Sequence, residues 1–329
     1  MRRISLPLFF FSLIFLLTIA KVEAWDKIPA KVLAHYIQAG IYERLNQLDK
    51  ATKEYKAALK SDYCSPQIHL SLAIALLKQN NLLQAVDELE LAIKYYETST
   101  ESPGQQTSFI EAHTLLALVY SLQGKLDEAT AEYEIALRGA LAIDPQNIRI
   151  HKSLAQVYLR ANRLSDAQKT YQFILNLAPH DSEAHFFLGN IYDEQGKRDE
   201  AIKEFKAALE FNSEYPDALN SLGYLYAEES INLEEAEEMI KKALTYEPNN
   251  GAYIDSLGWV YFKQGRYEEA IRELEQAVGV LSDPVIYEHL GDAYFKQGNL
   301  IEARENWQKS LEVGSKENLQ VKEKLEKYK

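Results

Sequence analysis

The sequence has little cysteine, glycine, proline or positive charge. Its 329 residues include a single cysteine, Cys64, which excludes an intramolecular disulfide and a thiolate metal cage. Fourteen glycines and nine prolines are too few for a fibrous protein, whereas 47% hydrophobic residues are too many for a disordered chain. Basic residues number 36 against 49 acidic ones, and the formal charge of -13 repels phosphate backbones and anionic lipids. We therefore expect a chain that folds by packing alone and does not bind nucleic acid.

One long hydrophobic run is present, at the N-terminus. Residues 1–24 begin with Arg2 and Arg3, continue through an apolar stretch and end in Val22-Glu23-Ala24, which is typical of a secretory signal peptide. Trp25 stands where a lipoprotein would carry cysteine, which disfavours lipid anchoring. The sequence predicts export to the periplasm or cell envelope. An uncleaved N-terminal membrane anchor is the alternative.

The other 305 residues contain one unit repeated about eight times. Its first marker is a small residue, followed three positions later by tyrosine in seven of the eight units, a spacing that indicates one face of a helix. The small residues are Ala39, Ala73, Ala117, Ala155, Gly189, Gly223, Gly258 and Gly291. Seven positions after each comes a residue that tolerates left-handed backbone and ends the helix. These turn residues are Asn46, Asn80, Gly124, Asn162, Gly196, Ser230, Gly265 and Gly298.

A second helix follows each turn. An alanine recurs in its first turns, and a large residue stands four positions later, which predicts close crossing of the two helices. The alanines are Ala51, Ala85, Ala129, Ala167, Ala201, Ala236, Ala270 and Ala303. Prolines then separate most units, because proline blocks continuation of the preceding helix. Each unit is therefore expected to be a helical hairpin.

This pattern of small residue, aromatic, turn residue, alanine and proline on a period of about 34 residues resembles the tetratricopeptide repeat (TPR) family. The resemblance covers roughly residues 33–313. The segments SLGYLYAEESINLEEAEEMIKKALTYEPNN and SLGWVYFKQGRYEEAIRELEQAV are similar to those of bacterial envelope proteins of this family. The resemblance implies an all-α fold, a right-handed α-solenoid of about eight hairpins, with a concave groove that binds proteins or peptides.

Three irregularities divide the chain. We expect the signal peptide over 1–24, an N-terminal segment with repeats one and two over 25–96, and a polar insertion loop over 97–108. Repeats three to eight follow over 109–313, and repeat three carries about one extra helical turn. A C-terminal capping helix is expected over 314–329, with Val321, Leu325 and Tyr328 on its apolar face.

Motifs of catalysis are missing from the chain. No paired-histidine metal motif, nucleophile elbow or phosphate loop is present, so we expect no enzyme activity, no cofactor and no small-molecule substrate. Five histidines stand four positions before the small residue of their units, at His35, His69, His113, His151 and His185. Packed helix axes lie about 8–10 Å apart, whereas the ligands of a metal must meet within about 2 Å of one ion, so we do not expect these histidines to share a metal. We expect each of them to pack on the partner helix of its hairpin.

The candidate binding residues lie on a second face of the first helices. Around Leu257 and Gly258, the residues Asp255, Trp259 and Phe262 fall about 100° away from the core positions. The equivalent residues in repeats five, six and eight are Phe186, Asn190 and Asp193, then Asn220 and Tyr224, then Glu288, Asp292 and Phe295. Either these residues line a groove that takes a basic or amide-rich extended segment, or the aromatic ones are core between repeats. In repeat four Arg149, Lys152 and Arg160 predict a basic stretch at one end of the groove.

Two functional hypotheses follow. The first is a non-catalytic, exported scaffold that binds a protein or peptide in the groove. The alternative is a fixed structural subunit of an envelope secretion or polysaccharide assembly, in contact with the membrane only if the N-terminal segment is retained.

Overall fold

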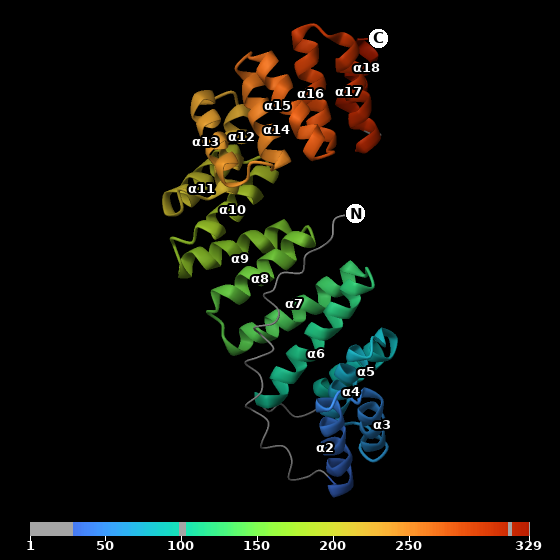
Figure 1. Cartoon of the computed structure of the whole chain (residues 1–329). Helices are drawn as coiled ribbons and strands as arrows, with labels where there is room; N and C mark the ends of the chain where they lie inside the picture. The colour runs from blue at the N-terminus through green and yellow to red at the C-terminus, as the bar shows by residue number, and fades with distance from the viewer. Residues whose placement is uncertain (1–28, 99–102, 315–317, 329) are drawn as a thin grey trace. The chain divides into compact units, whose positions relative to one another are not determined.

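The computed structural model describes residues 29–98, 103–314 and 318–328, and this part of the chain is helical, with short turns between the helices (Figure 1). The predicted signal peptide lies outside the described residues. None of the described helices is long and apolar enough to cross a membrane. The helices are α2 (Ala30–Arg44), α3 (Leu48–Leu59), α4 (Pro66–Lys78), α5 (Leu82–Thr98), α6 (Pro103–Leu122), α7 (Leu126–Ile143), α8 (Ile148–Arg160), α9 (Leu164–Leu177), α10 (Ser182–Glu194), α11 (Arg198–Phe211), α12 (Pro216–Glu228), α13 (Leu233–Tyr246), α14 (Gly251–Lys263), α15 (Tyr267–Val280), α16 (Pro284–Gln297), α17 (Leu300–Val313) and α18 (Leu319–Lys327).

The helices form the predicted hairpins, which confirms the all-α repeat fold. Helices α2 to α7 pack in successive pairs, as do α10 to α17, and each second helix also packs on the first helix of the next pair. The chain divides into two compact units, one ending at Thr170 and the other beginning at Tyr171.

Backbone conformation ends each first helix as the sequence predicts. All eight predicted turn residues have positive φ, from 54° at Ser230 to 96° at Gly298. Glycine takes this conformation without steric cost, and asparagine is the side chain that tolerates it best. The turn in repeat six contains a second such residue, Asn232 with φ 47°, which accommodates the extra residue of that repeat.

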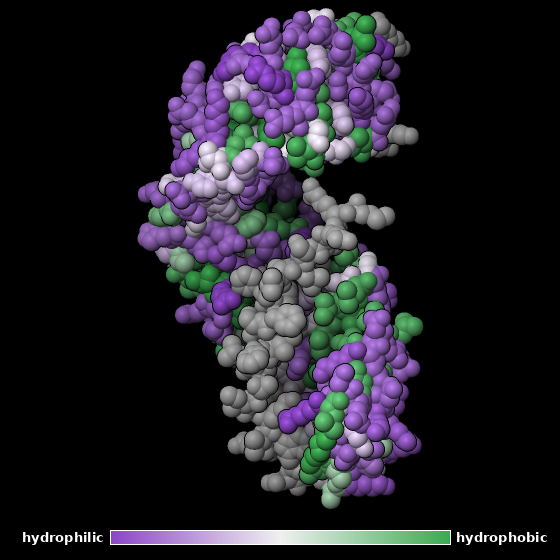
Figure 2. All heavy atoms as spheres, viewed as in Figure 1, coloured by the Kyte–Doolittle hydropathy of each residue, from purple (hydrophilic) through white to green (hydrophobic). Residues whose placement is uncertain are grey.

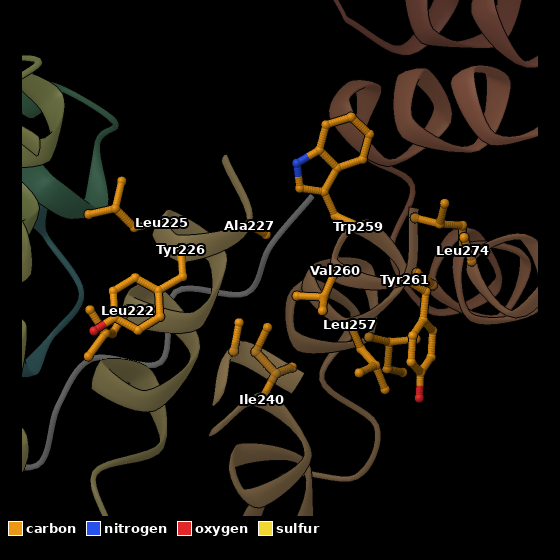
Figure 3. Close-up of a cluster of buried hydrophobic side chains, with 14 of the residues drawn as sticks. Leu222, Leu225, Tyr226, Ala227, Ile240, Leu257, Trp259, Val260, Tyr261 and Leu274 are labelled. Atoms are coloured by element: carbon orange, nitrogen blue, oxygen red, sulfur yellow. The ribbon is translucent and has the colours of Figure 1, made fainter. Parts of the chain in front are cut away.

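The small residues allow the two helices of a hairpin to touch. A Cβ built on Gly258 would lie 2.6 Å from Cγ of Leu274, and one on Gly223 would lie 2.7 Å from Cγ1 of Ile240. Both large residues are the ones predicted to face the small column. Figure 3 shows side chains of α12 to α15 gathered in the core of the second unit, while the Trp259 ring points away from Val260.

Two predicted boundaries differ from the structure. Helix α6 begins at Pro103, inside the segment expected to be a loop over 97–108, because proline suits the first turn of a helix and Ile110 and Ala112 are buried on the same helix. Helix α18 begins after Asn318, whose Oδ1 accepts from the amide of Val321. The extra turn of repeat three is present, since α7 has 18 residues and the second helices of repeats four to eight have 14.

Candidate functional site

The candidate surface lies on the first helices of the second unit. We define the A-face as the residues three before, one after and four after the small residue of α10, α12, α14 and α16. Its members are Phe186, Asn190, Asp193, Asn220, Tyr224, Ala227, Asp255, Trp259, Phe262, Glu288, Asp292 and Phe295. They share a face because offsets of three and four positions bring side chains together on a helix.

Trp259 on α14 is fixed on every side. Its ring stacks on His289 of α16 at 4.0 Å and on Phe262 at 4.6 Å between ring centroids. Its indole Nε1 donates to Oε1 of Glu228 on α12 at 2.6 Å, and Lys263 Nζ lies 5.1 Å from the ring centroid. The side chain is 8% exposed, and it belongs to the hydrophobic core of this unit. Trp259 therefore joins repeats six, seven and eight and presents only an edge to solvent.

A buried contact between a carboxylate and an imidazole lies beside Trp259. The carboxylate of Asp255 is 2.9 Å from Nδ1 of His289, and both side chains are buried. Tyr224 of α12 lies 6.4 Å from the same imidazole, measured between ring centroids. Burial raises the pKa of the Tyr224 hydroxyl well above its ordinary value, and the nearby carboxylates of Glu228 and Asp255 raise it further. This part of the A-face is thus an aromatic and polar cluster in which the carboxylate of Asp255 already contacts an imidazole.

The A-face of repeat eight is covered by α18. Lys324 Nζ lies 2.9 Å from Oε1 of Glu288 and 2.7 Å from both oxygens of Asp292, and Tyr328 packs on Phe295 with ring centroids 4.4 Å apart. Burial lowers the pKa of Lys324, but the hydrogen bonds that its ammonium donates to the two carboxylates raise the pKa by more. The pKa of Lys324 therefore lies above its ordinary value. Two of the predicted acidic groove residues, Glu288 and Asp292, are therefore already bound to a lysine of the chain itself.

Repeat five contributes one buried and two half-buried residues. Phe186 is buried against Tyr215, with 4.9 Å between ring centroids, and belongs to the core. Asp193 forms an ion pair with Arg198, whereas Asn190 is half-buried. In repeat six, Oδ1 of Asn220 is buried without a hydrogen-bond partner among the described residues. The amide side chains of Asn190 and Asn220, like the hydroxyl of Tyr224, are polar groups of the A-face outside these ion pairs.

The predicted basic stretch lies on α8, in the first unit. Arg149 and Arg160 are exposed and Lys152 is half-buried. The structure keeps the three residues on one helix, and their role at an end of the groove stays a prediction.

The sequence analysis missed a recurring pair inside the hairpins. Nδ1 of His69 lies 2.6 Å from Glu88, and Nδ1 of His185 lies 2.6 Å from Glu204, each 19 positions further along the chain. His35 and His113 pair in the same way with Glu54 and Glu132. These four histidines face their partner helices, as expected, and the recurring spacing of 19 is the signal that would have found the glutamates. Nε2 of His151 contacts the carbonyl oxygen of Pro145. In the described part of the chain no three metal-ligating side chains gather into a metal site.

Comparison with known families agrees with the hairpin architecture. Models described as TPR or tetratricopeptide repeats match residues 36–106 and 256–314, 110–134, 135–191, 189–229 and 216–250. Together these matches cover nearly all of the described hairpins.

The relatives share only the repeat region. The TPR repeat-containing protein PA4667 of Pseudomonas aeruginosa is 26% identical over 57% of this chain and 32% of its own length. The protein O-mannosyl-transferase TMTC1 of Homo sapiens is 29% identical over 70% of this chain and 26% of its own length. The chain thus spans about a third or less of these curated relatives.

Solved structures show the same fold. A tetratricopeptide repeat protein from Parabacteroides merdae superposes with a TM-score of 0.58 at 20% identity, over 80% of this chain and 98% of that one. A chain of the Cut9–Hcn1 hetero-tetramer of the APC/C superposes with a TM-score of 0.57 at 15% identity, over 92% of this chain and 76% of that one.

Proposed function

The chain belongs to the tetratricopeptide repeat family, and from this premise we propose that it is a non-catalytic, exported scaffold that binds a segment of a partner protein on the A-face. The observation that carries the proposal is α18, a polypeptide segment that already lies on the repeat-eight part of this face. It is held there by the two carboxylates around Lys324 and by the contact between Tyr328 and Phe295.

The part of the A-face that α18 does not cover, in repeats five to seven, defines the chemistry of the ligand. Asp193 is paired with Arg198, and the carboxylate of Asp255 is buried against the imidazole of His289, so neither carboxylate is free to bind a basic segment. The half-buried amide of Asn190 both donates and accepts hydrogen bonds as a peptide backbone requires, whereas Oδ1 of Asn220 is buried. The half-buried ring of Phe262 supplies apolar contact. An amide-rich, weakly charged extended segment therefore fits this surface better than a strongly basic one.

Export is part of the proposal and is supported by sequence alone. Arg2 and Arg3, the apolar run after them and the small residues before Trp25 are the features that a signal peptidase substrate requires. In that case the working protein is the chain from Trp25 to Lys329, and its partners are periplasmic or envelope proteins.

Peptide selection tests the binding proposal. We would select random 12-residue peptides on the 25–329 chain and measure their binding by fluorescence anisotropy. In the test variant, Asn190→Arg is combined with Asn220→Arg, which places bulky charge on the A-face at half-buried sites. The matched control is Ile301→Arg on α17, a residue that is 72% exposed and outside the A-face.

We expect the selected peptides to bind wild type and control equally and the double variant at least 10-fold more weakly. Circular dichroism of the three proteins confirms that each remains folded. Equal binding to all three would place the peptide site elsewhere and overturn the A-face assignment.

One observation favours the alternative of a fixed structural subunit. Helix α2 exposes several large hydrophobic residues, as a subunit in permanent contact with another protein would. N-terminal sequencing of the protein from its native envelope separates the two functions, because retention of Met1–Ala24 supports the anchored subunit and a new N-terminus at Trp25 supports the exported scaffold.

A further inference from the structure

Helix α2 carries an exposed hydrophobic stripe at the start of the described array. Ile37 is 53% exposed, Ile41 is 46% exposed and Leu45 is 60% exposed, and their spacing of four places them in one row along the helix. Figure 2 shows hydrophobic surface over the region where Figure 1 labels α2. We call these three residues the α2 stripe.

One of these helix positions, that of Ile41, is buried in most later repeats. Ile41 stands two residues after the small residue of repeat one, and its counterparts in repeats two, three, six, seven and eight are all buried. These are Ala75, Val119, Leu225, Val260 and Ala293. In each case the first helix packs on the second helix of the preceding repeat, which covers this face. Ile41 thus occupies a position that is buried between repeats elsewhere in the chain, although Ile41 and the rest of the α2 stripe are exposed.

Most described junctions also share one direction of polar contact. At these junctions a donor on the later repeat points to a carboxylate on the earlier one. Examples are Lys78 to Glu43 at 2.5 Å, Arg266 to Glu237 at 2.7 Å and Tyr294 to Glu275 at 2.6 Å. The opposite direction occurs between Arg198 and Glu229, at a longer 3.6 Å. A helix that packs on α2 in the place of a preceding repeat should therefore carry carboxylates beside its row of apolar side chains.

Helix α2 supplies the donors that such a surface would meet. Arg44 is exposed and occupies the same repeat position as Lys78, and Tyr42 occupies that of Tyr294. Lys31, also exposed, adds a second positive charge near the start of the helix. A second copy of α2 would bring like charges together, which disfavours symmetric pairing of two chains through this face.

We propose that the α2 stripe is the docking surface for an acidic amphipathic helix of another protein. The apolar row of the partner helix covers Ile37, Ile41 and Leu45. The carboxylates of the partner helix lie against Arg44 and Tyr42. The contact continues the array by one helix and is separate from the A-face, so that either site can fail without the other. Leucine, isoleucine and carboxylates at offsets of three and four define the partner segment.

A helix from the chain itself serves as the probe. The peptide of residues 266–281 contains α15, which covers the matching face of α16 and carries the carboxylate of Glu275. It is synthesised with blocked ends and an internal cross-link, because isolated helices of this length are marginally stable in water. Its binding to the 25–329 chain is followed by fluorescence anisotropy.

We expect saturable binding that weakens at least 10-fold in Ile41→Asp and in Ile37→Asp. The control Leu83→Asp, at a leucine that is 77% exposed on α5, should bind as wild type does. A peptide with Glu275→Lys should bind about 5-fold more weakly, as the loss of one charge-assisted contact implies. Because Ile37 and Ile41 are exposed, neither substitution should reduce the helical content measured by circular dichroism.

Three results would overturn the proposal. The first is absence of saturable binding, or binding that is equal in Ile41→Asp and wild type. The second is a dimer of the 25–329 chain in sedimentation velocity that Ile41→Asp abolishes, since the occupant would then be a second copy. The third is binding to the 25–329 chain but not to the 1–329 chain, which would make residues 1–24 the occupant.

Discussion

Two glycines on neighbouring helices of the second unit provide a matched test of the packing argument. Gly258 of α14 faces α15, and a Cβ there would lie 2.6 Å from Cγ of Leu274 and 3.3 Å from the carbonyl oxygen of Ala270. Gly279 of α15 is exposed, and a Cβ there would meet no atom within 4 Å. Both glycines are helical, so replacement by alanine brings each the same gain in helix propensity.

The expected free energies follow from these contacts. Glycine to alanine in a helix stabilises by about 1 kcal/mol, so Gly279→Ala should raise the free energy of unfolding by about that amount. At Gly258 the same gain is opposed by overpacking, which costs about 1–3 kcal/mol in a packed core. The difference between the two variants isolates the packing cost and should be about 1–3 kcal/mol. Gly258→Leu adds three more carbon atoms and should unfold the last repeats.

Urea unfolding of the 25–329 chain measures both variants. Two of its three tryptophans, Trp259 and Trp307, lie in repeats seven and eight, so that fluorescence reports mainly on the region around Gly258. Far-UV circular dichroism follows the whole array, which need not unfold in one step. If Gly258→Ala proved as stabilising as Gly279→Ala, the small column would not be required for close approach of the helices, and the reasoning would be refuted.

Three further predictions concern polar contacts. Burial and the hydrogen bond to Glu275 together raise the pKa of Tyr294 to about 12. The stabilising effect of the neutral hydroxyl is therefore complete below pH 10 and is lost as the pH rises through 12. Between these pH values Tyr294→Phe should lose less stability than wild type in urea unfolding. Lys324→Ala should speed amide hydrogen exchange in α18 at least 10-fold and leave α14 unchanged; equal protection in both proteins would contradict the role given to the lysine. Glu204→Ala removes the partner of His185 and should destabilise the protein by about 1–2 kcal/mol in thermal unfolding, with partial recovery in Glu204→Gln.

The sequence by itself determined the repeat and its local geometry. Offsets of three, four and seven around the small residues predict the helices, and asparagine or glycine at the end of a first helix predicts the positive φ of Asn46 and Gly265. The contact of Gly258 with Leu274 also follows from the repeat, because two helices joined by a short turn must cross at the position with room for it.

The tertiary structure alone decided which polar residues of the A-face are paired. Lys324 meets Glu288 and Asp292 across more than thirty positions, and no local period marks that contact. The exposure of Trp259 was likewise undetermined, because a residue on the second face of a helix is exposed or buried according to the neighbouring repeat. Periodicity fixes the direction in which a side chain points from its own helix. The partners of that side chain on other helices depend on how the hairpins stack. The repeat could therefore be predicted from the sequence, and the pairing of the A-face residues could not.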